Sequence, residues 1–243
     1  MTTNLRRRIG KLFSERPGSE MISYTVEGDV AVLRMDDGKL NVVNPTFIKA
    51  MNEALDQAEA DKAKALVLEG RDTVFSAGFD LKEFAKGQDQ ARVQVRDGFA
   101  MLIRILDFPR PIVAACKGHG IGMGIFLLMV CDYRVGAEGP YKYSMPESRI
   151  GMDLGELLIA LAKSRISPKY LTRMAVLSED LDVQTAVDAG VLDEIVDAPE
   201  VHSRAMEIAT GLATMPVAFG KNKREIKATE LGNMRAALKV LGG

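Results

Sequence analysis

The chain has 243 residues, of which 47% are hydrophobic and 27% are charged, and its formal net charge is −1. A chain of this length buries most of its apolar surface in one domain, or in one domain with an appendage. The balanced charge excludes the basic character of a typical nucleic-acid-binding protein, and no apolar run reaches the roughly 18 residues that a membrane-spanning helix needs. We therefore expect neither a nucleic acid nor a membrane as a partner.

Two features of the sequence favour a cytoplasmic location. Cys116 and Cys131 are the only cysteines, and their apolar surroundings indicate buried free thiols in a reducing compartment. The arginines near the N-terminus are not followed by an apolar segment, so the sequence does not predict a secretory leader.

The first elements are expected after a flexible N-terminal extension, residues 1–20, which shows little periodicity. Residues 22–26 and 30–35 have the composition of strands and surround a short glycine-containing turn, which predicts a β-hairpin. Over residues 44–60 the apolar side chains recur at helical spacing, and Pro45 stands where the first turn of a helix tolerates proline.

The middle of the chain alternates between strand and helix patterns. Residues 65–68 and 112–116 are short apolar runs typical of buried parallel strands, and residues 93–106 between them have helical periodicity. This alternation indicates crossover connections and a parallel sheet. Further helices are expected over residues 154–165, 168–177, 183–189, 202–215 and 218–241. The sequence thus predicts an α/β core followed by a helical C-terminal portion.

Two glycine-containing segments follow the buried strands. Residues 75–82 read Phe-Ser-Ala-Gly-Phe-Asp-Leu-Lys, and residues 118–124 read Gly-His-Gly-Ile-Gly-Met-Gly at the start of an apolar helix. Glycine lets the backbone approach a ligand, and two backbone N–H groups aimed at one oxygen form an oxyanion hole. A tight turn with close helix packing explains the same glycines. The spacing matches neither a dinucleotide-binding fingerprint nor a phosphate-binding P-loop.

Several ordered motifs together resemble the crotonase (enoyl-CoA hydratase/isomerase) superfamily. They are residues 75–82, 118–132, 146–151 and 186–196, with Asn41 ahead of the first helix. The resemblance implies a ββα spiral core over residues 21–195 and a C-terminal helical trimerisation region over 196–243, which is shorter than usual. It also implies a homotrimer or a dimer of trimers and an acyl-CoA thioester substrate. Coenzyme A would enter as part of the substrate, with no separate cofactor and no metal.

The resemblance also assigns residues to the oxyanion hole. Phe79 and Met123 occupy the positions whose backbone N–H groups bind the thioester oxygen in this family. Gly78, Gly122 and Gly124 would keep the backbone path open, and Ala77 is a candidate substrate-binding residue beside them. Because the donors are main-chain groups, bulky side chains at positions 79 and 123 do not forbid the role.

The family's hydratases use two glutamates, and only one is present here. The first position holds Phe126, which cannot activate water, and the second holds Glu147. A single carboxylate suits the Δ3,Δ2-enoyl-CoA isomerases, in which one glutamate removes a C2 proton and returns it at C4. The segment Cys131–Arg134 also resembles isomerase members. We expect apolar neighbours such as Phe126 to exclude water and to raise the pKa of Glu147 by desolvation.

Two other functions stay open. A hydratase could hold its water with Asp153 or Glu156, although a carboxylate near a helix N-terminus commonly has a structural role. A non-catalytic member could bind acyl-CoA with Phe126 in place of a catalytic group. Basic side chains that could contact the phosphates of coenzyme A are Lys82, Lys117, Lys221, Lys223 and Arg224.

Overall fold

A computed structural model describes residues 21–242, so the predicted extension over residues 1–20 lies outside the described part of the chain. The strands are β1 Ile22–Glu27, β2 Val30–Met35, β3 Ala65–Glu69, β4 Thr73–Ser76, β5 Ile112–Cys116, β6 Gly118–Ile121, β7 Tyr133–Ala137, β8 Tyr143–Ser144 and β9 Glu194–Val196. The α-helices are α2 Pro45–Ala60, α3 Leu81–Phe84, α4 Gln88–Leu106, α5 Met123–Met129, α6 Gly155–Arg165, α7 Pro168–Ala175, α8 Val183–Ala189, α9 Val201–Ala213, α10 Ala218–Ile226 and α11 Ala228–Gly242.

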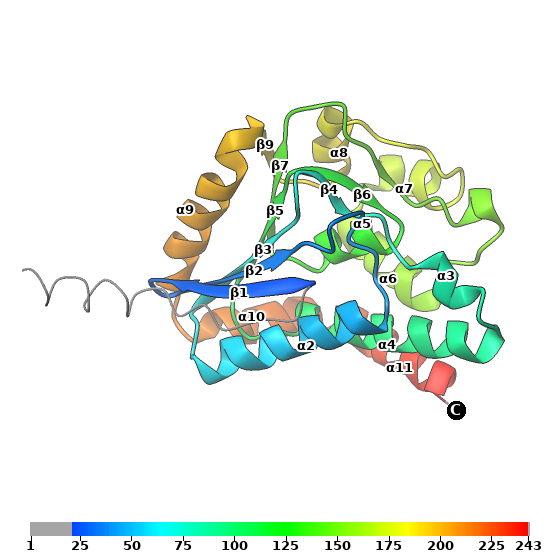
Figure 1. The fold of residues 1–243 in the computed structure, drawn as a ribbon, viewed down its shortest axis with the longest axis horizontal. Coiled ribbons are helices and arrows are strands. Elements are labelled where there is room, and N and C mark those ends of the chain that lie inside the picture. The colour runs from blue at the N-terminus through cyan, green and yellow to red at the C-terminus, as the bar shows by residue number, and fades with distance from the viewer. Residues whose placement is uncertain (1–20, 243) are drawn as a thin grey trace, which may run out of the picture.

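The strands form two sheets that the chain visits in turn (Figure 1). The larger sheet has the order β1-β2-β3-β5-β7-β9, in which β1 and β2 are an antiparallel hairpin and the other pairs are parallel. The smaller sheet has the order β4-β6-β8 and is parallel. Successive strand pairs β3–β4, β5–β6 and β7–β8 each place one strand in each sheet, so the core is a ββα spiral, as the sequence predicted.

The large sheet is covered on both faces because its central strands are apolar throughout. Every residue of β3 and of β5 is buried, as is typical of parallel strands. On one face α9 packs with Val201, Ala205 and Ala209, all fully buried, and Figure 1 shows this helix standing alone on that side. Alanines at every fourth position let α9 approach the sheet closely.

The C-terminal portion is helical, as predicted, but the prediction of one continuous helix over residues 218–241 is wrong. Residues 218–241 form two helices, because the chain leaves the helical path at Lys227. The break lets α11 turn back and pack against α4 and α6, where Leu231 and Met234 are buried. Tertiary packing of an apolar face here outweighs the continuous helical periodicity of the sequence.

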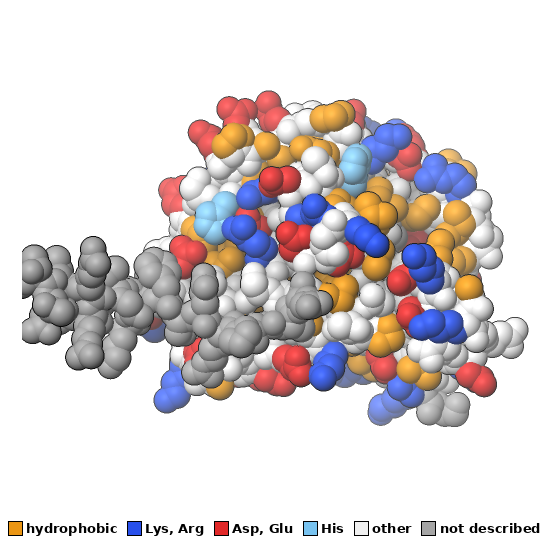
Figure 2. Space-filling model, viewed as in Figure 1, with side chains coloured by type: hydrophobic (Ala, Val, Ile, Leu, Met, Phe, Trp, Pro, Cys, Tyr) orange, Lys and Arg blue, Asp and Glu red, His pale blue; other side chains and the backbone are white. Residues whose placement is uncertain are grey.

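The surface carries mixed charges. In the view of Figure 2, acidic and basic side chains are interspersed with no large region of one sign, in keeping with the net charge of −1. Among the helices between residues 21 and 242, none is both long enough and apolar enough to cross a membrane.

Candidate active site

The smaller sheet brings the sequence motifs together. Because β4, β6 and β8 are parallel neighbours, the segments that follow them all start at the carboxyl end of the sheet. Gly78 follows β4, Gly122 follows β6, and Glu147 follows β8. The carboxyl ends of parallel strands are a common place for ligand sites. Three segments that are distant in the sequence therefore meet at the carboxyl end of the smaller sheet.

The first two segments are in backbone contact. A β-carbon built on Gly78 would lie 2.9 Å from the carbonyl oxygen of Ile121 and 3.0 Å from the backbone nitrogen of Met123. Gly78 also has a φ of +92°, a conformation that side chains disfavour. Glycine at position 78 is thus required by both space and conformation.

Two backbone N–H groups are left free where these segments meet. Val43 donates its N–H to the carbonyl of Gly78 (2.8 Å), and Asp80 donates its N–H to the carbonyl of Val43 (3.1 Å). In this parallel bridge the N–H of Phe79 is not used. Within residues 21–242, neither the Phe79 N–H nor the Met123 N–H donates a hydrogen bond. The structure therefore brings together the two amides that the sequence selected.

A buried hydrogen-bond relay fixes the loop that carries Phe79. Asn41 donates from Nδ2 to the carbonyls of Met35 (2.9 Å) and Phe75 (3.1 Å). The Ser76 hydroxyl donates to the carbonyl of Asn41 (2.7 Å) and accepts from the N–H of Gly78 (3.2 Å). Asn41 and Ser76 are both buried. The relay orients the peptide that immediately precedes the Phe79 amide.

The start of α5 is pressed against β4. A β-carbon on Gly124 would lie 2.1 Å from the carbonyl oxygen of Ser76, so only glycine allows this approach. Ala77 is partly buried and donates its N–H to the carbonyl of Leu40 (3.0 Å). Its N–H is therefore occupied, and its contribution is to the loop geometry.

Glu147 faces the glycine segments. Its Oε1 lies 3.4 Å from the position that a β-carbon on Gly122 would occupy. Its Oε2 is buried and has no hydrogen-bond partner among the described residues. Burial raises the pKa of the Glu147 carboxyl, and a backbone hydrogen bond within the same residue opposes this effect only in part. A desolvated carboxylate with a raised pKa is suited to accept and hold a proton.

Phe126 belongs to the interior of the protein. Its side chain is fully buried in the main hydrophobic cluster, and its helix α5 is buried along its whole length. It therefore lies in the core rather than on an open surface. The raised pKa of Glu147 comes from burial, as expected, and a contribution of Phe126 to that burial stays a prediction.

The alternative acids are placed differently. Asp153 and Glu156 are both exposed, and the Oδ1 of Asp153 accepts a hydrogen bond from the N–H of Gly155 (3.0 Å). They are among the residues that line a cavity of about 350 Å³ between α4, α6 and α11. Its other lining residues are Val95, Phe99, Leu154, Gly155, Leu157, Ala237, Val240 and Leu241.

Three of the five candidate phosphate-binding cations are engaged in close ion pairs. Lys117 lies 2.7 Å from the buried Glu69, Lys223 lies 2.7 Å from Asp132, and Arg224 lies 2.8 Å from Asp107. Lys82 and Lys221 are exposed. Lys221, Lys223 and Arg224 stand on α10, whereas Lys82 is in α3 and Lys117 follows β5.

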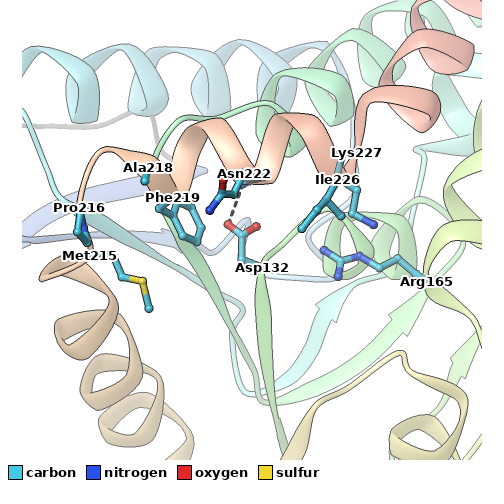
Figure 3. Close-up of a pocket in the computed structure, with 10 residues that line it drawn as sticks. Asp132, Arg165, Met215, Pro216, Ala218, Phe219, Asn222, Ile226 and Lys227 are labelled. Atoms are coloured by element: carbon cyan, nitrogen blue, oxygen red, sulfur yellow. Dashed lines mark hydrogen bonds and ion pairs between the residues drawn. The ribbon is translucent and has the colours of Figure 1, made fainter.

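A second cavity, of about 500 Å³, lies beneath α10 (Figure 3), and neither Phe79 nor Met123 lines it. Its apolar wall contains Met215, Phe219 and Ile226. Its polar groups are largely used: Lys223 pairs with Asp132, and the Arg165 guanidinium donates to the carbonyls at the end of α5. These contacts fix the far end of α5.

Sequence reasoning missed two supporting positions. Ser76 lies inside a recognised motif, but only the fold shows its hydroxyl joining Asn41 to Gly78. Gly98 stands within the predicted helix 93–106, and an isolated glycine in a helical pattern commonly marks close packing. The glycine at position 98 could therefore have been recognised from the sequence as a site of close packing. In the part of the chain that the structure describes, no three His, Cys, Asp or Glu side chains are grouped to hold a metal ion.

Comparisons with known proteins agree with this architecture. Residues 25–238 match the Enoyl-CoA hydratase/isomerase family, and the chain belongs to this family. It is 30% identical over 201 residues to a probable enoyl-CoA hydratase of Bacillus subtilis, covering 79% of this chain and 76% of that protein.

Two solved mycobacterial structures share the fold at a TM-score of 0.88. One is an enoyl-CoA hydratase of Mycobacterium marinum, 38% identical, covering 91% of this chain and 98% of that chain. The other is described as an Mtb enoyl-CoA isomerase, 36% identical, covering 92% of this chain and 98% of that chain. Relatives with both activities in their names therefore resemble this chain to a similar degree.

Proposed function

We propose that this protein shifts a double bond in an acyl-CoA thioester, converting 3-enoyl-CoA to 2-enoyl-CoA. The observation that carries the proposal is a single partly buried carboxylate, Glu147, whose Oε2 is buried and unpaired, beside two free backbone amides, those of Phe79 and Met123. One base and one oxyanion hole are sufficient for an allylic proton transfer.

In the proposed reaction the thioester oxygen accepts hydrogen bonds from the N–H groups of Phe79 and Met123. The Glu147 carboxylate removes a proton from C2, and the electron pair of that C–H bond moves into an enolate whose charge lies on the oxygen. The same proton then returns to C4 while the double bond moves to C2–C3. Preorganised amides stabilise the charge that develops in the transition state.

Hydration requires more than this site supplies. Adding water across C2–C3 needs one group to activate the water and proton delivery at C2. Phe126 stands in the buried interior, and the two nearby acids, Asp153 and Glu156, are exposed. A lone desolvated carboxylate favours isomerisation over hydration.

The cavity between α4, α6 and α11 is the proposed site of the acyl tail. Phe99 lines this cavity, and its ring centroid is 6.4 Å from that of Phe79. The apolar wall thus begins next to the proposed oxyanion hole. Coenzyme A enters with the substrate, and no separate cofactor is required by this chemistry.

Assembly into a homotrimer or a dimer of trimers through residues 196–243 is part of the proposal. Three apolar side chains near α10 support it, since Met215, Val217 and Ile226 are 49%, 83% and 74% exposed. Ile226→Asp is expected to lower the molecular mass seen by sedimentation, whereas Leu177→Asp, at an exposed position on another face, should leave it unchanged.

Glu147→Gln tests the reaction. With 3-enoyl-CoA as substrate, the wild type should generate conjugated 2-enoyl-CoA, and the variant should lose about 10²- to 10⁴-fold in rate. Acyl-CoA binding, measured by calorimetry, should persist. Glu138→Gln, the same change at an exposed glutamate outside this cavity, is the matched control and should retain activity.

Three results would contradict the proposal. Loss of conjugated absorbance from crotonyl-CoA, with no turnover of 3-enoyl-CoA, would indicate a hydratase. Acyl-CoA binding without turnover of either substrate would indicate a non-catalytic protein. Equal activity of the wild type and Glu147→Gln would remove Glu147 from the mechanism.

A further inference from the structure

Gly98, in the middle of α4, lies under both proposed oxyanion residues. A β-carbon built on Gly98 would stand 2.6 and 2.7 Å from Cε1 and Cζ of the Phe79 ring. It would also stand 3.3 Å from the Cε atom of Met123. The side chains of two residues that are distant in the sequence therefore converge on one helical position.

The Phe79 ring is partly buried and lies beside two other aromatic rings. Its centroid lies 5.6 Å from that of Phe84 and 6.4 Å from that of Phe99, so aromatic rings flank it. Met123 is only 2% exposed and is held in the main core. The aromatic ring is rigid, so a group that pushes its outer atoms acts on the Phe79 backbone more directly than one that meets the flexible end of Met123.

A second contact joins this face of α4 to Val43, the residue that forms the parallel bridge with Phe79. Gln94 precedes Gly98 by one helical turn and thus lies on the same face. Its Nε2 donates to the carbonyl of Val43 (2.8 Å), which also accepts the N–H of Asp80. That carbonyl belongs to the bridge that turns the Phe79 N–H away from Val43.

We propose that the Gln94–Gly98 face of α4 is the support that positions both oxyanion amides, with Gly98 as a positioning residue. This inference rests on the proposed function and adds residues that do not touch the substrate. The missing side chain at Gly98 lets the Phe79 ring and the Met123 thioether pack on the helix, and their backbones are then held at the separation seen here.

Gly98→Ala combined with Phe79→Leu tests this support. The methyl group of alanine would push the Phe79 ring, and a small displacement of a donor amide should lower kcat about tenfold with KM changed less than about twofold. Leucine at position 79 lacks the two ring atoms that the methyl meets. The methyl group would then meet only the flexible Cε end of Met123, at 3.3 Å, so in the Phe79→Leu background Gly98→Ala should lower kcat clearly less than in the wild type.

Gly211→Ala is the matched control. Gly211 also stands in a helix, α9, and nothing lies within 4 Å of its built β-carbon. Alanine is the better helix former at such a position. This variant should unfold at a slightly higher temperature and keep the wild-type kinetics.

Gln94→Met provides a second test should Gly98→Ala fold poorly. Methionine keeps the side-chain length, and the Val43 carbonyl keeps its bond from Asp80. The expected result is again a lower kcat with little change in KM.

Equal effects of Gly98→Ala in both backgrounds, or unchanged kcat in Gln94→Met, would overturn the support role alone. A wild-type protein that turns over no enoyl-CoA would overturn the proposed function and this inference together.

Discussion

The Oε1 atom of Glu147 lies 3.4 Å from the position that a β-carbon on Gly122 would occupy, and Cα of Gly78 lies 3.9 Å from that position. The proposed base and the two backbone segments of the proposed oxyanion hole thus share one small volume. The absence of a side chain at Gly122 leaves that volume open. In the proposed reaction it receives the thioester and its α-carbon.

The raised pKa of Glu147 predicts opposite effects of pH on activity and on stability. The base must be ionised, so kcat/KM should rise with pH through an apparent pKa above the ordinary value of 4.5. The folded state holds the proton more tightly than the unfolded state. The free energy of unfolding therefore falls as pH rises from about the unfolded pKa to the folded pKa.

Glu147→Gln removes that ionisation. The variant should unfold at a higher temperature than the wild type at pH 8, and the difference should shrink below about pH 4.5. Thermal unfolding across this range measures it. A constant difference at all pH values would contradict the assignment of the raised pKa to Glu147.

Gly122→Ala should lower activity by crowding the base. The new methyl group would contact Glu147 Oε1 at 3.4 Å, and the backbone of Gly122, at φ +53° and ψ −126°, lies in a region that residues with a side chain rarely adopt. We expect kcat/KM to fall about tenfold, as for a small misplacement of reacting groups. The apparent kinetic pKa should rise, because the methyl removes water from the carboxylate.

Gly28→Ala separates crowding from backbone strain. Gly28 has a φ of +63°, and nothing lies within 4 Å of its built β-carbon. Gly28→Ala should lower the stability through its positive φ alone and keep the wild-type kinetics. Similar kinetic losses in the two variants would show that the Gly122 effect is not local to Glu147.

Ser76→Ala should weaken the oxyanion hole without affecting the binding of coenzyme A. The change removes the hydroxyl that joins the Asn41 carbonyl to the Gly78 N–H. The loosened loop should lower kcat about tenfold, whereas the affinity for free coenzyme A should be unchanged by calorimetry. Ser23→Ala, at an exposed position in β1, is the control. An unchanged kcat in Ser76→Ala would remove the relay from the mechanism.

Phe126→Glu should destabilise the protein rather than create a hydratase. Position 126 is fully buried within α5, and an unpaired carboxyl group there should lower the free energy of unfolding by about 3 kcal/mol or more. Phe126→Leu should cost less, because it keeps the site apolar. Denaturant unfolding compares the two, and a Phe126→Glu protein as stable as the wild type would contradict this burial.

Several elements could be predicted from the sequence because their patterns report burial. The β1–β2 hairpin, α2, β3 and β5 agree closely with their predicted positions. The strands of the smaller sheet were not predicted. β4, β6 and β8 have two to four residues each, and β6 contains two glycines, so they show no clear alternation. Their pairing comes from the spiral path of the chain.

The sequence by itself determined the family resemblance and the α/β class, and it selected Phe79, Met123 and Glu147 as the candidate site residues. Motifs in a fixed order carry this information directly. Only the tertiary structure decided which N–H groups are free, how deeply Glu147 is buried and which residues support the loop. The contacts of Ser76 with Asn41, and of Gly98 with Phe79 and Met123, join distant parts of the chain. Hydrophobic periodicity records which face of an element is buried, but not which neighbour it meets.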